Sequence, residues 1–361
     1  MNSINKTYAK LEKLLILYTE LANYTIACLE ELAISHKIDT HVVHYNLNPE
    51  APFKFETSNK NLKFYKRELF DEKSLISLTD ELAPNLLYCA GWADKNYLAT
   101  ARFFKKKGGK TLLGFDNQWN GNLKQVLSSI YARFIIKPLF DYAFVPGNRQ
   151  VDFALKLGFK ENKIIEGAYS ADVNSFSKFH DKQKQVKQAS FPKRFIFVGR
   201  YVHAKGLQLL WEAFIEVNNE GTNKWELWCL GVGPIKQLAN KHIKHLGFVQ
   251  PKQLENILEQ TGVFVLPSVF EPWGVVVHEF AAAGFPIIAS TNVGASDTFV
   301  SENRNGIIFQ AENKEELKRA LKKIIDMSDD DLLNWSAESN KLSKQITTSS
   351  WANSLNNIIK N

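Results

Sequence analysis

Two glutamates, Glu271 and Glu279, lie in the segment SVFEPWGVVVHEFAAAGFPIIAS, residues 268–290. The preceding VFVLP run reads as a strand, and VVVHEFAAA reads as a helix that ends at Gly284, with Pro286 just beyond it. A loop carboxylate can accept hydrogen bonds from sugar hydroxyls or face a developing positive charge. A carboxylate further along the helix can reach a pair of vicinal hydroxyls, as in a ribose. The alternative is a loop acid and a helix-surface acid without a common role.

The start of that helix adds a third feature, a set of free backbone amides at Gly274, Val275 and Val276. These amides and the helix dipole would favour an anion such as a diphosphate. Gly274 would also let a ligand approach the backbone closely. The segment therefore predicts a nucleotide-sugar site, with one acid at each end and the diphosphate between them.

A second cluster is FVGRYVHAKG, residues 197–206, again a strand followed by a loop and a helix. Arg200 and Lys205 could neutralise a diphosphate and stabilise it as a leaving group, while Gly199 and Gly206 permit tight turns. A basic pair after a strand is more often a solvated surface. Together, however, the two clusters supply opposite charges for one site.

Two histidines accompany these clusters. His203 lies in the basic loop, where it could approach the phosphates, although a lone loop histidine usually does not. His278 precedes Glu279 and faces another side of the helix, so we expect it to be structural.

The composition fits a globular chain with two domains. Of the 361 residues 45% are hydrophobic, and 45 Lys and Arg against 38 Asp and Glu give a formal charge of +7. This excess suits an anionic partner, although it can simply aid solubility, and nucleic-acid binding has no other support. The three cysteines, Cys28, Cys89 and Cys229, stand singly in apolar segments, which favours core positions over a zinc or disulfide site. No apolar run approaches the roughly 20 residues of a membrane span, and the opening residues lack a signal-peptide core. We therefore expect a cytoplasmic protein, either free or peripheral at the inner membrane face.

Strand-like runs alternate with amphipathic stretches, which predicts an α/β fold with parallel sheets. The rhythm breaks in a polar segment, residues 177–193, read as a linker. The expected organisation is two Rossmann-like doubly wound domains, 1–176 and 194–345, facing each other across a cleft, followed by a terminal helix over 346–361. Ligands of such sheets bind beyond the carboxyl ends of the strands, where both clusters fall. The predicted strands are 14–18, 41–45, 86–89, 111–114, 142–145, 194–199, 226–231, 263–267 and 286–290.

The two clusters resemble the donor-site motifs of retaining glycosyltransferases with the GT-B fold, of the family 4 type. Glu271 and Glu279 match that family's Glu-x7-Glu arrangement, and residues 168–176, 230–234 and 245–258 add lesser similarities. The likeness is specific across 195–310 and weak across the first 165 residues. It implies an enzyme that retains the anomeric configuration by front-face substitution, needs no cofactor or metal, and packs its last helix back onto the first domain.

The resemblance also implies roles for individual residues. Arg200 and Lys205 would contact the donor diphosphate, and Glu279 would hold the ribose. Glu271, with the amides of 273–276, would bind the sugar and the phosphates. The residues that make up this implied donor site are Gly199, Arg200, Lys205, Glu271, Trp273, Gly274, Val275, Val276 and Glu279.

The acceptor side departs from the family pattern, because no Gly-rich loop follows the first strand. Glu20 and Asn23 occupy that position instead. Asp116, after the strand 111–114, is the nearest counterpart of an acceptor-side acid, with turn capping as its alternative. Trp119 could stack on a sugar face or belong to the core.

Two stretches bear on membrane contact. ARFFKKKGGK, residues 101–110, combines phenylalanines with lysines and could touch anionic lipid head groups, and the apolar stretch 123–140 follows it. A charged helix end and a core helix are the plainer interpretations of these stretches.

We therefore expect a transferase that moves a sugar from a UDP- or GDP-sugar to a hydroxyl of a glycan or glycolipid precursor, as in cell-surface polysaccharide or lipopolysaccharide synthesis. A sugar-nucleotide epimerase with the same fold and a non-catalytic nucleotide- or glycan-binding module are the alternatives. A phosphorylase would need a much longer chain with a pyridoxal-binding lysine. A nicotinamide dehydrogenase would need the rest of a G-x-G-x-x-G fingerprint after LGVGP, 230–234.

Overall fold

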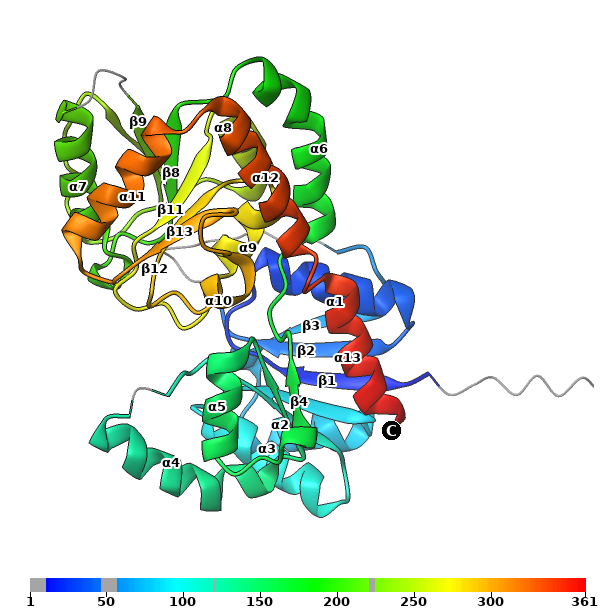
Figure 1. The fold of residues 1–361 in the computed structure, drawn as a ribbon. Helices are drawn as coiled ribbons and strands as arrows, with labels where there is room; N and C mark the ends of the chain where they lie inside the picture. Colours follow the sequence, from blue (N-terminus) through cyan, green and yellow to red (C-terminus); the bar gives the residue numbers. More distant parts are fainter. Residues whose placement is uncertain (1–10, 47–56, 120, 221–224) are drawn as a thin grey trace, which may run out of the picture.

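The computed structural model describes residues 11–46, 57–119, 121–220 and 225–361, which form two α/β units, one above the other (Figure 1). The first unit contains a seven-stranded sheet in the order β3-β2-β1-β4-β5-β6-β7, and the second a six-stranded sheet in the order β10-β9-β8-β11-β12-β13. All the strand pairs are parallel. Two Rossmann-like domains are therefore present, as the alternation of strands and helices predicts.

The first sheet is covered on both faces. Leu14 and Ile16 of β1 belong to the core under α1, whereas Leu15 and Leu17 belong to the core under α3. This alternation follows from the two-residue period of a strand, and it explains why β1 is apolar at every position from Leu14. The elements of this domain are β1 (Lys13–Leu17), α1 (Asn23–Ser35), β2 (Asp39–His44), β3 (Leu62–Lys66), η1 (Arg67–Leu69), α2 (Glu72–Leu82), β4 (Leu86–Ala90), α3 (Lys95–Lys106), β5 (Thr111–Gly114), α4 (Leu123–Ile135), η2 (Lys137–Leu139), β6 (Tyr142–Val145), α5 (Asn148–Lys156), η3 (Glu161–Lys163) and β7 (Ile164–Glu166).

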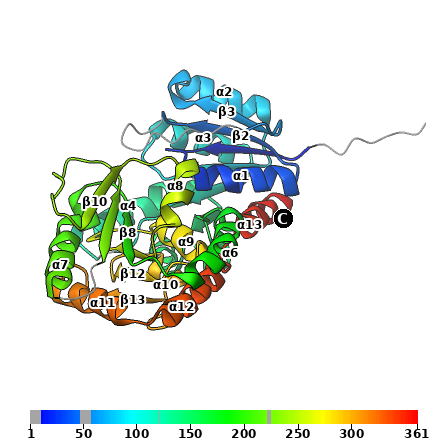
Figure 2. The same cartoon turned by 90° about the horizontal axis from the view of Figure 1, so that it is seen from above.

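The second sheet lies between two helical layers, as the view from above shows (Figure 2). Its centre is aromatic: the rings of Phe264 and Phe280 stack at 4.1 Å, and those of Phe195 and Trp225 lie 4.6 Å apart. The elements of this domain and of the C-terminal segment are α6 (Val173–Ala189), β8 (Arg194–Val198), η4 (His203–Lys205), α7 (Leu207–Glu220), β9 (Glu226–Leu230), β10 (Ile243–Gly247), α8 (Pro251–Leu258), β11 (Val263–Leu266), α9 (Val275–Ala282), β12 (Ile287–Ser290), α10 (Ser296–Phe299), β13 (Gly306–Phe309), α11 (Lys314–Asp326), α12 (Asp329–Ser343) and α13 (Thr348–Lys360).

All nine predicted strands are present, each within two residues of its expected ends. The strands that the sequence pattern does not reveal are β3, β7, β10 and β13, which include every edge strand of the two sheets. β3 (LKFYK) and β10 (IKHLG) combine apolar with exposed polar side chains, so neither forms a continuous apolar run. β13 (GIIF) is apolar and largely buried, and it was missed despite that pattern.

The segment read as a linker, 177–193, is largely helical, because α6 runs from Val173 to Ala189. Asp172 caps it by accepting a hydrogen bond from the Ser175 amide at 3.1 Å. The helix packs against α9 and α12 of the second domain through a narrow buried stripe, while its other faces are polar. A stripe of this width leaves too few apolar residues for the helix to be recognised from composition.

The last helix, α13, returns to the first domain and packs against α1 (Figure 1). Trp351 is buried there and donates a hydrogen bond from Nε1 to the Ala168 carbonyl oxygen at 2.9 Å. The three cysteines are buried and unpaired, which confirms the core positions expected for them. In the part of the chain that the structure describes, no helix has both the length and the hydropathy needed to cross a bilayer.

Candidate active site

The helix α9 begins in the loop that follows β11. Gly274 precedes it with φ +93°, and no side chain caps it. Within the described ranges the amides of Gly274, Val275 and Val276 donate no hydrogen bond to the protein, so they are available to an anion. A Cβ at Gly274 would lie 2.9 Å from the Glu271 Cγ, so glycine here leaves room for that side chain.

Hydrogen bonds of its own backbone to the loop after β12, and not contacts with α9, hold Glu271 in place. Its amide donates to the Asn292 carbonyl oxygen at 3.2 Å, and its carbonyl oxygen accepts from the Gly294 amide at 3.1 Å. Asn292 in turn donates through Nδ2 to the Val269 carbonyl oxygen at 2.7 Å. The loop after β12 therefore sets the position of the Glu271 carboxylate.

Lys205 forms an ion pair with Glu271, which brings the two sequence clusters into direct contact. The two side chains are 17% and 14% exposed. Gly206 follows with φ +65°, and a Cβ there would lie 2.0 Å from the Pro267 carbonyl oxygen, so only glycine fits this turn. The Val269 and Phe270 amides donate to the Ala204 carbonyl oxygen, which joins the basic loop to the glutamate loop.

Gly199 and Arg200 lie at the end of β8, beside this pair. The Gly199 amide donates to the Leu230 carbonyl oxygen at 3.0 Å, and a Cβ at Gly199 would contact the Lys205 Cδ at 3.7 Å. Arg200 is exposed. The Lys205 side chain thus passes over the glycine toward Glu271.

Glu279 is half-buried on α9, and burial, with a smaller contribution from the charge of Asp172, raises its pKa to about 7. Its charge in turn is one of the influences that raise the pKa of Tyr24, which belongs to α1 of the first domain. Glu279 therefore faces the first domain near the start of α1.

His278 has the structural role expected for it. The ring is fully buried, accepts a hydrogen bond at Nδ1 from the Ala171 amide and donates from Nε2 to the Ser343 carbonyl oxygen. Burial lowers its pKa to about 4, so the ring is neutral. His203 is exposed in η4.

From the first domain, Asp116 approaches the same place after β5. Burial raises its pKa, and the charge of Glu271 raises it further, so the two carboxylates lie near enough to interact across the domain boundary. Gln150 donates from Nε2 to the Asp116 carbonyl oxygen at 3.0 Å and to the Pro272 carbonyl oxygen at 2.7 Å. Gln118 reaches the Glu271 carbonyl oxygen at 3.4 Å.

An ion pair closes the boundary beside these contacts. Arg149 binds Asp297 through two hydrogen bonds of 2.6 Å and donates to the Thr291 carbonyl oxygen at 3.0 Å. Sequence reasoning missed Gln118, Gln150 and Arg149. The signal that could have found them is their place directly after the strands β5 and β6, at the edge of the sheet where ligands bind.

The two tryptophans of the predicted site are used for packing. Trp119 lies against Phe153 at 6.0 Å, with the Lys156 Nζ 5.4 Å from its ring centre, so its ring belongs largely to the core. Trp273 is 2% exposed, and its ring packs so closely against Gly147 that a Cβ at that position would clash with it. The Trp273 side chain therefore helps to join the domains, and only its backbone is left for a donor.

The two predicted acceptor residues of the first loop differ in their exposure to solvent. Glu20 is exposed, and Asn23 is half-buried as the first residue of α1. Tyr24, which sequence reasoning passed over, packs edge-on against Tyr169 at 5.9 Å, and burial, with smaller contributions that include the charges of Asp116 and Glu279, raises its pKa.

The basic segment 101–110 is engaged within the protein. Lys105 pairs with Asp141, and Lys107 pairs with Asp80. Lys110 donates to the Ile358 carbonyl oxygen at 2.7 Å, at the end of α13. These contacts support the plainer interpretation, a charged helix end, over a lipid-binding patch.

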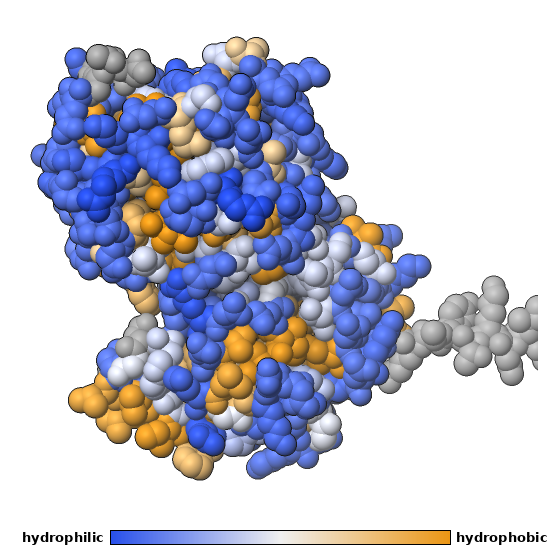
Figure 3. All heavy atoms as spheres, in the orientation of Figure 1, coloured by the Kyte–Doolittle hydropathy of each residue, from blue (hydrophilic) through white to orange (hydrophobic). Residues whose placement is uncertain are grey.

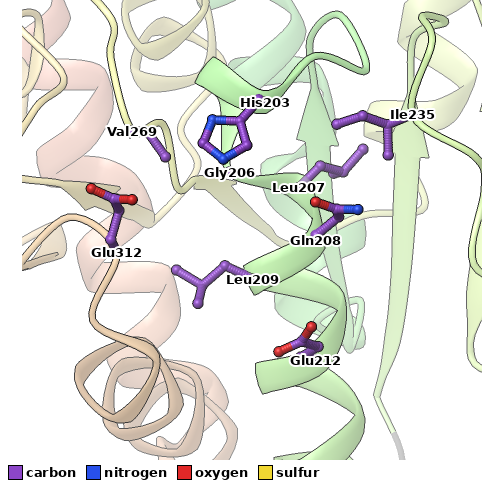
Figure 4. Close-up of a pocket in the computed structure, with 9 residues that line it drawn as sticks. All are labelled: His203, Gly206, Leu207, Gln208, Leu209, Glu212, Ile235, Val269 and Glu312. Atoms are coloured by element: carbon purple, nitrogen blue, oxygen red, sulfur yellow. The ribbon is translucent and has the colours of Figure 1, made fainter.

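A pocket of about 220 Å³ lies at the start of α7 (Figure 4). Its lining is His203, Gly206, Leu207, Gln208, Leu209, Glu212, Ile235, Val269 and Glu312. The pocket borders the basic loop, yet Lys205, Glu271 and Glu279 do not line it. We therefore place the chemistry at the ion pair and not in this pocket. Among the described residues no group of three or more His, Cys, Asp and Glu side chains could hold a metal ion, and metal independence stays a prediction.

Residues 192–327 match the family model described as glycosyl transferases group 1. An uncharacterised glycosyltransferase of Methanocaldococcus jannaschii is 30% identical over 142 residues, which are 37% of this chain and 36% of the relative. The alpha-monoglucosyldiacylglycerol synthase of Acholeplasma laidlawii is 31% identical over 135 residues, 35% of this chain and 33% of the relative. These alignments thus span about a third of the curated relatives.

The likeness in structure extends over both domains. The crystal structure of the Anabaena protein HepE in complex with UDP superposes with a TM-score of 0.72 at 12% identity, covering 97% of this chain and 100% of that one. Residues 192–327 therefore match the glycosyl transferases group 1 family, and the two sheets have the arrangement of GT-B glycosyltransferases.

Proposed function

We propose that the protein is a retaining glycosyltransferase of the family 4 type that moves a sugar from a UDP- or GDP-sugar to an acceptor hydroxyl. The observation that carries the proposal is the Lys205–Glu271 ion pair beside the uncapped amides of α9. A cation and a row of free amides suit a diphosphate, while the carboxylate suits the hydroxyls of the sugar that it carries. The match of residues 192–327 to the glycosyltransferase family supports the same chemistry.

In this proposal the donor replaces contacts that the protein makes with itself. Lys205 turns from Glu271 to the diphosphate, with Arg200 as the second cation, and the leaving phosphate gains their charge. Glu271 is then released to accept hydrogen bonds from the sugar. Glu279 accepts hydrogen bonds from the ribose hydroxyls, in its ionised form. No cofactor or metal ion is required.

The reaction then proceeds on one face of the sugar. The bond from the anomeric carbon to the phosphate oxygen breaks, and the acceptor oxygen bonds to the same face of that carbon. The acceptor proton passes to the departing phosphate oxygen. Asp116, whose pKa the charge of Glu271 helps to raise, would orient the acceptor hydroxyl by accepting its hydrogen bond.

For the acceptor we propose a glycan or glycolipid precursor of a cell-surface polysaccharide or lipopolysaccharide. The Acholeplasma relative is named as a synthase of a glucosylated diacylglycerol, which supports a lipid acceptor, although its alignment covers 35% of this chain.

The test is a thermal-shift and turnover screen against UDP-, GDP-, ADP- and dTDP-sugars, with and without a chelator. We expect one nucleotide class to raise the melting temperature equally under both conditions. Lys205→Met should lose that shift, whereas Lys318→Met, which removes a partly buried cation of α11 that pairs with Glu216 far from the proposed site, should keep it. Stabilisation by none of the donors, or only without chelator, would contradict the proposed donor site. Epimerisation of the donor without an acceptor would favour the sugar-nucleotide epimerase instead.

A further inference from the structure

The helix α4 exposes an apolar face to solvent. The face consists of Leu123, Leu127, Ile130, Tyr131, Phe134 and Ile135, which are between 43% and 83% exposed. At 100° per residue these positions share one side of the helix, and the buried Ser129, Ala132 and Ile136 occupy the other. In Figure 3 this face is the hydrophobic protrusion at the lower left, where Figure 1 places α4.

This arrangement contradicts the reading of 123–140 as a core helix. The helix is attached through η2 and its buried side, and its most apolar side faces outward. Monomeric soluble proteins rarely expose a contiguous apolar surface of this kind without a partner for it.

The surrounding charge indicates which partner fits. Residues 101–160 contain eleven lysines and arginines against three aspartates, an excess of eight positive charges, whereas the whole chain carries +7. Two of these cations, Lys107 and Arg149, pair with Asp80 and Asp297 outside this range, which leaves an excess of six. Arg133 is exposed on α4 itself, and Lys137 lies just after the helix. A second copy of the chain would bring the same positive charge to the contact and be repelled, whereas anionic head groups would be attracted.

We propose that α4 lies in the plane of an anionic lipid bilayer, with the leucine, isoleucine and phenylalanine side chains of this face inserted among the acyl chains. Tyr131 would lie at the head-group level and Arg133 would pair with lipid phosphates. The helix is long enough to lie on a membrane surface but too short to cross it.

The attachment of α4 connects this surface to the proposed active site. The Gln125 side chain donates to the Gln118 carbonyl oxygen at 2.6 Å. The side-chain amide of Gln118 in turn donates to the Glu271 carbonyl oxygen. The loop that carries Asp116 therefore lies between the bilayer contact and Glu271. If the protein has the proposed function, this arrangement favours an acceptor that is delivered from the membrane.

The experiment is flotation of the full chain with vesicles of phosphatidylcholine alone and of phosphatidylcholine with phosphatidylglycerol, without any nucleotide sugar. We expect binding to the anionic vesicles, weakened by salt. The variant Leu127→Gln/Phe134→Gln should lower the partition coefficient at least about tenfold. The matched control is Ile34→Gln/Leu69→Gln, two side chains of similar exposure outside α4, which should bind as the wild type does.

Unchanged binding of the α4 variant, or no binding by the wild type, would overturn the proposal. So would a dimer in solution that the α4 substitutions dissociate, because the face would then belong to a second copy. Since no donor is present, a negative flotation result leaves the proposed glycosyl transfer untouched. A failed donor screen likewise leaves the vesicle result standing.

Discussion

At the scale of single residues, the Lys205–Glu271 pair joins a cation and a carboxylate whose side chains are both less than a fifth exposed. Partial burial makes each charge depend on the other, because either one alone would be poorly solvated. A diphosphate can take the place of Glu271 beside Lys205, and a sugar can then take the place of Lys205 beside Glu271. The pair is therefore both a stabilising contact and a site held ready for a ligand with complementary groups.

Replacing Lys205 by methionine separates these two roles. The unpaired Glu271 should lower the free energy of unfolding by about 2 kcal/mol, and turnover should fall by roughly 10²–10³-fold. The double variant Lys205→Met/Glu271→Gln should recover most of the stability but not the turnover. Urea unfolding and initial rates measure the two effects. Wild-type rates in the folded single variant would show that Lys205 has no part in the reaction.

Glu279 should make stability depend on pH. Its pKa is about 7 in the folded protein against 4.5 ordinarily, so the folded state holds the proton that the unfolded chain has already released. The free energy of unfolding should therefore fall as the pH rises between these two values and stay lower above them. Glu279→Gln removes this loss and should stabilise the protein by up to about 2 kcal/mol above the folded pKa, with little effect below 4.5.

The same substitution should weaken donor binding about tenfold if Glu279 accepts the ribose hydroxyls. Urea titrations at several pH values and calorimetry with the donor would follow both effects. Glu255→Gln, on the exposed side of α8, is the control. An identical pH profile for Glu279→Gln and the wild type would argue against the raised pKa of Glu279.

At the scale of elements, the site depends on how chain segments enter and leave the strands. The loop β11–α9 carries Glu271 and the free amides, and the loop β8–α7 carries Lys205. Both loops turn through glycines with positive φ, Gly274 and Gly206. The side chains can therefore meet only if these turns keep their conformation.

Gly274→Ala tests this dependence. The left-handed φ should cost about 1 kcal/mol of stability, and the new Cβ, 2.9 Å from the Glu271 Cγ, should displace that carboxylate and weaken donor binding. Gly108→Ala is the matched control, because Gly108 has φ +81° and open space around its Cβ position. It should lose similar stability and keep the donor affinity. Equal donor affinity in both variants would show that the position of Glu271 does not matter for the donor.

At the scale of the whole molecule, the site is completed by contact between domains. Gln118 and Gln150 reach the Glu271 loop from the first domain, and Arg149 holds Asp297 with two hydrogen bonds. The charge of Glu271 helps to raise the pKa of Asp116, and the charge of Glu279 helps to raise the pKa of Tyr24, each across the domain boundary. Relative movement of the domains would therefore separate the acceptor side from the donor side.

Arg149→Met should loosen this boundary. Because Arg149 lies outside the proposed donor contacts, the donor dissociation constant should stay within about twofold of the wild type while turnover falls about tenfold or more. Calorimetry and rate measurements would separate the two, and small-angle scattering would report the domain separation. The control is Arg304→Met, which removes an ion pair with Glu338 within the second domain. A loss of donor affinity equal to the loss of turnover would contradict this role.

The sequence by itself determined both sheets and most of their strands, because buried parallel strands are continuous apolar runs separated by helical stretches. It also indicated that Glu271 and Lys205 end up after strands of one sheet, since each follows an apolar run and precedes a glycine turn. The edge strands β3 and β10 and the helix α6 escaped recognition, because many of their side chains are polar and exposed.

Only the tertiary structure decided which residues meet. The contact of Gln150 with the Pro272 carbonyl oxygen joins positions 122 residues apart, and no local pattern encodes such a distance. Trp119 and Trp273 could have stacked on a sugar, but the positions of Phe153 and Gly147 assign their rings to packing. The apolar residues of α4 had the spacing of a core helix, and they are exposed because no other element of the described fold covers that side. Spacing along the chain determines which face of a helix is apolar, whereas the arrangement of the neighbouring elements determines whether that face is buried.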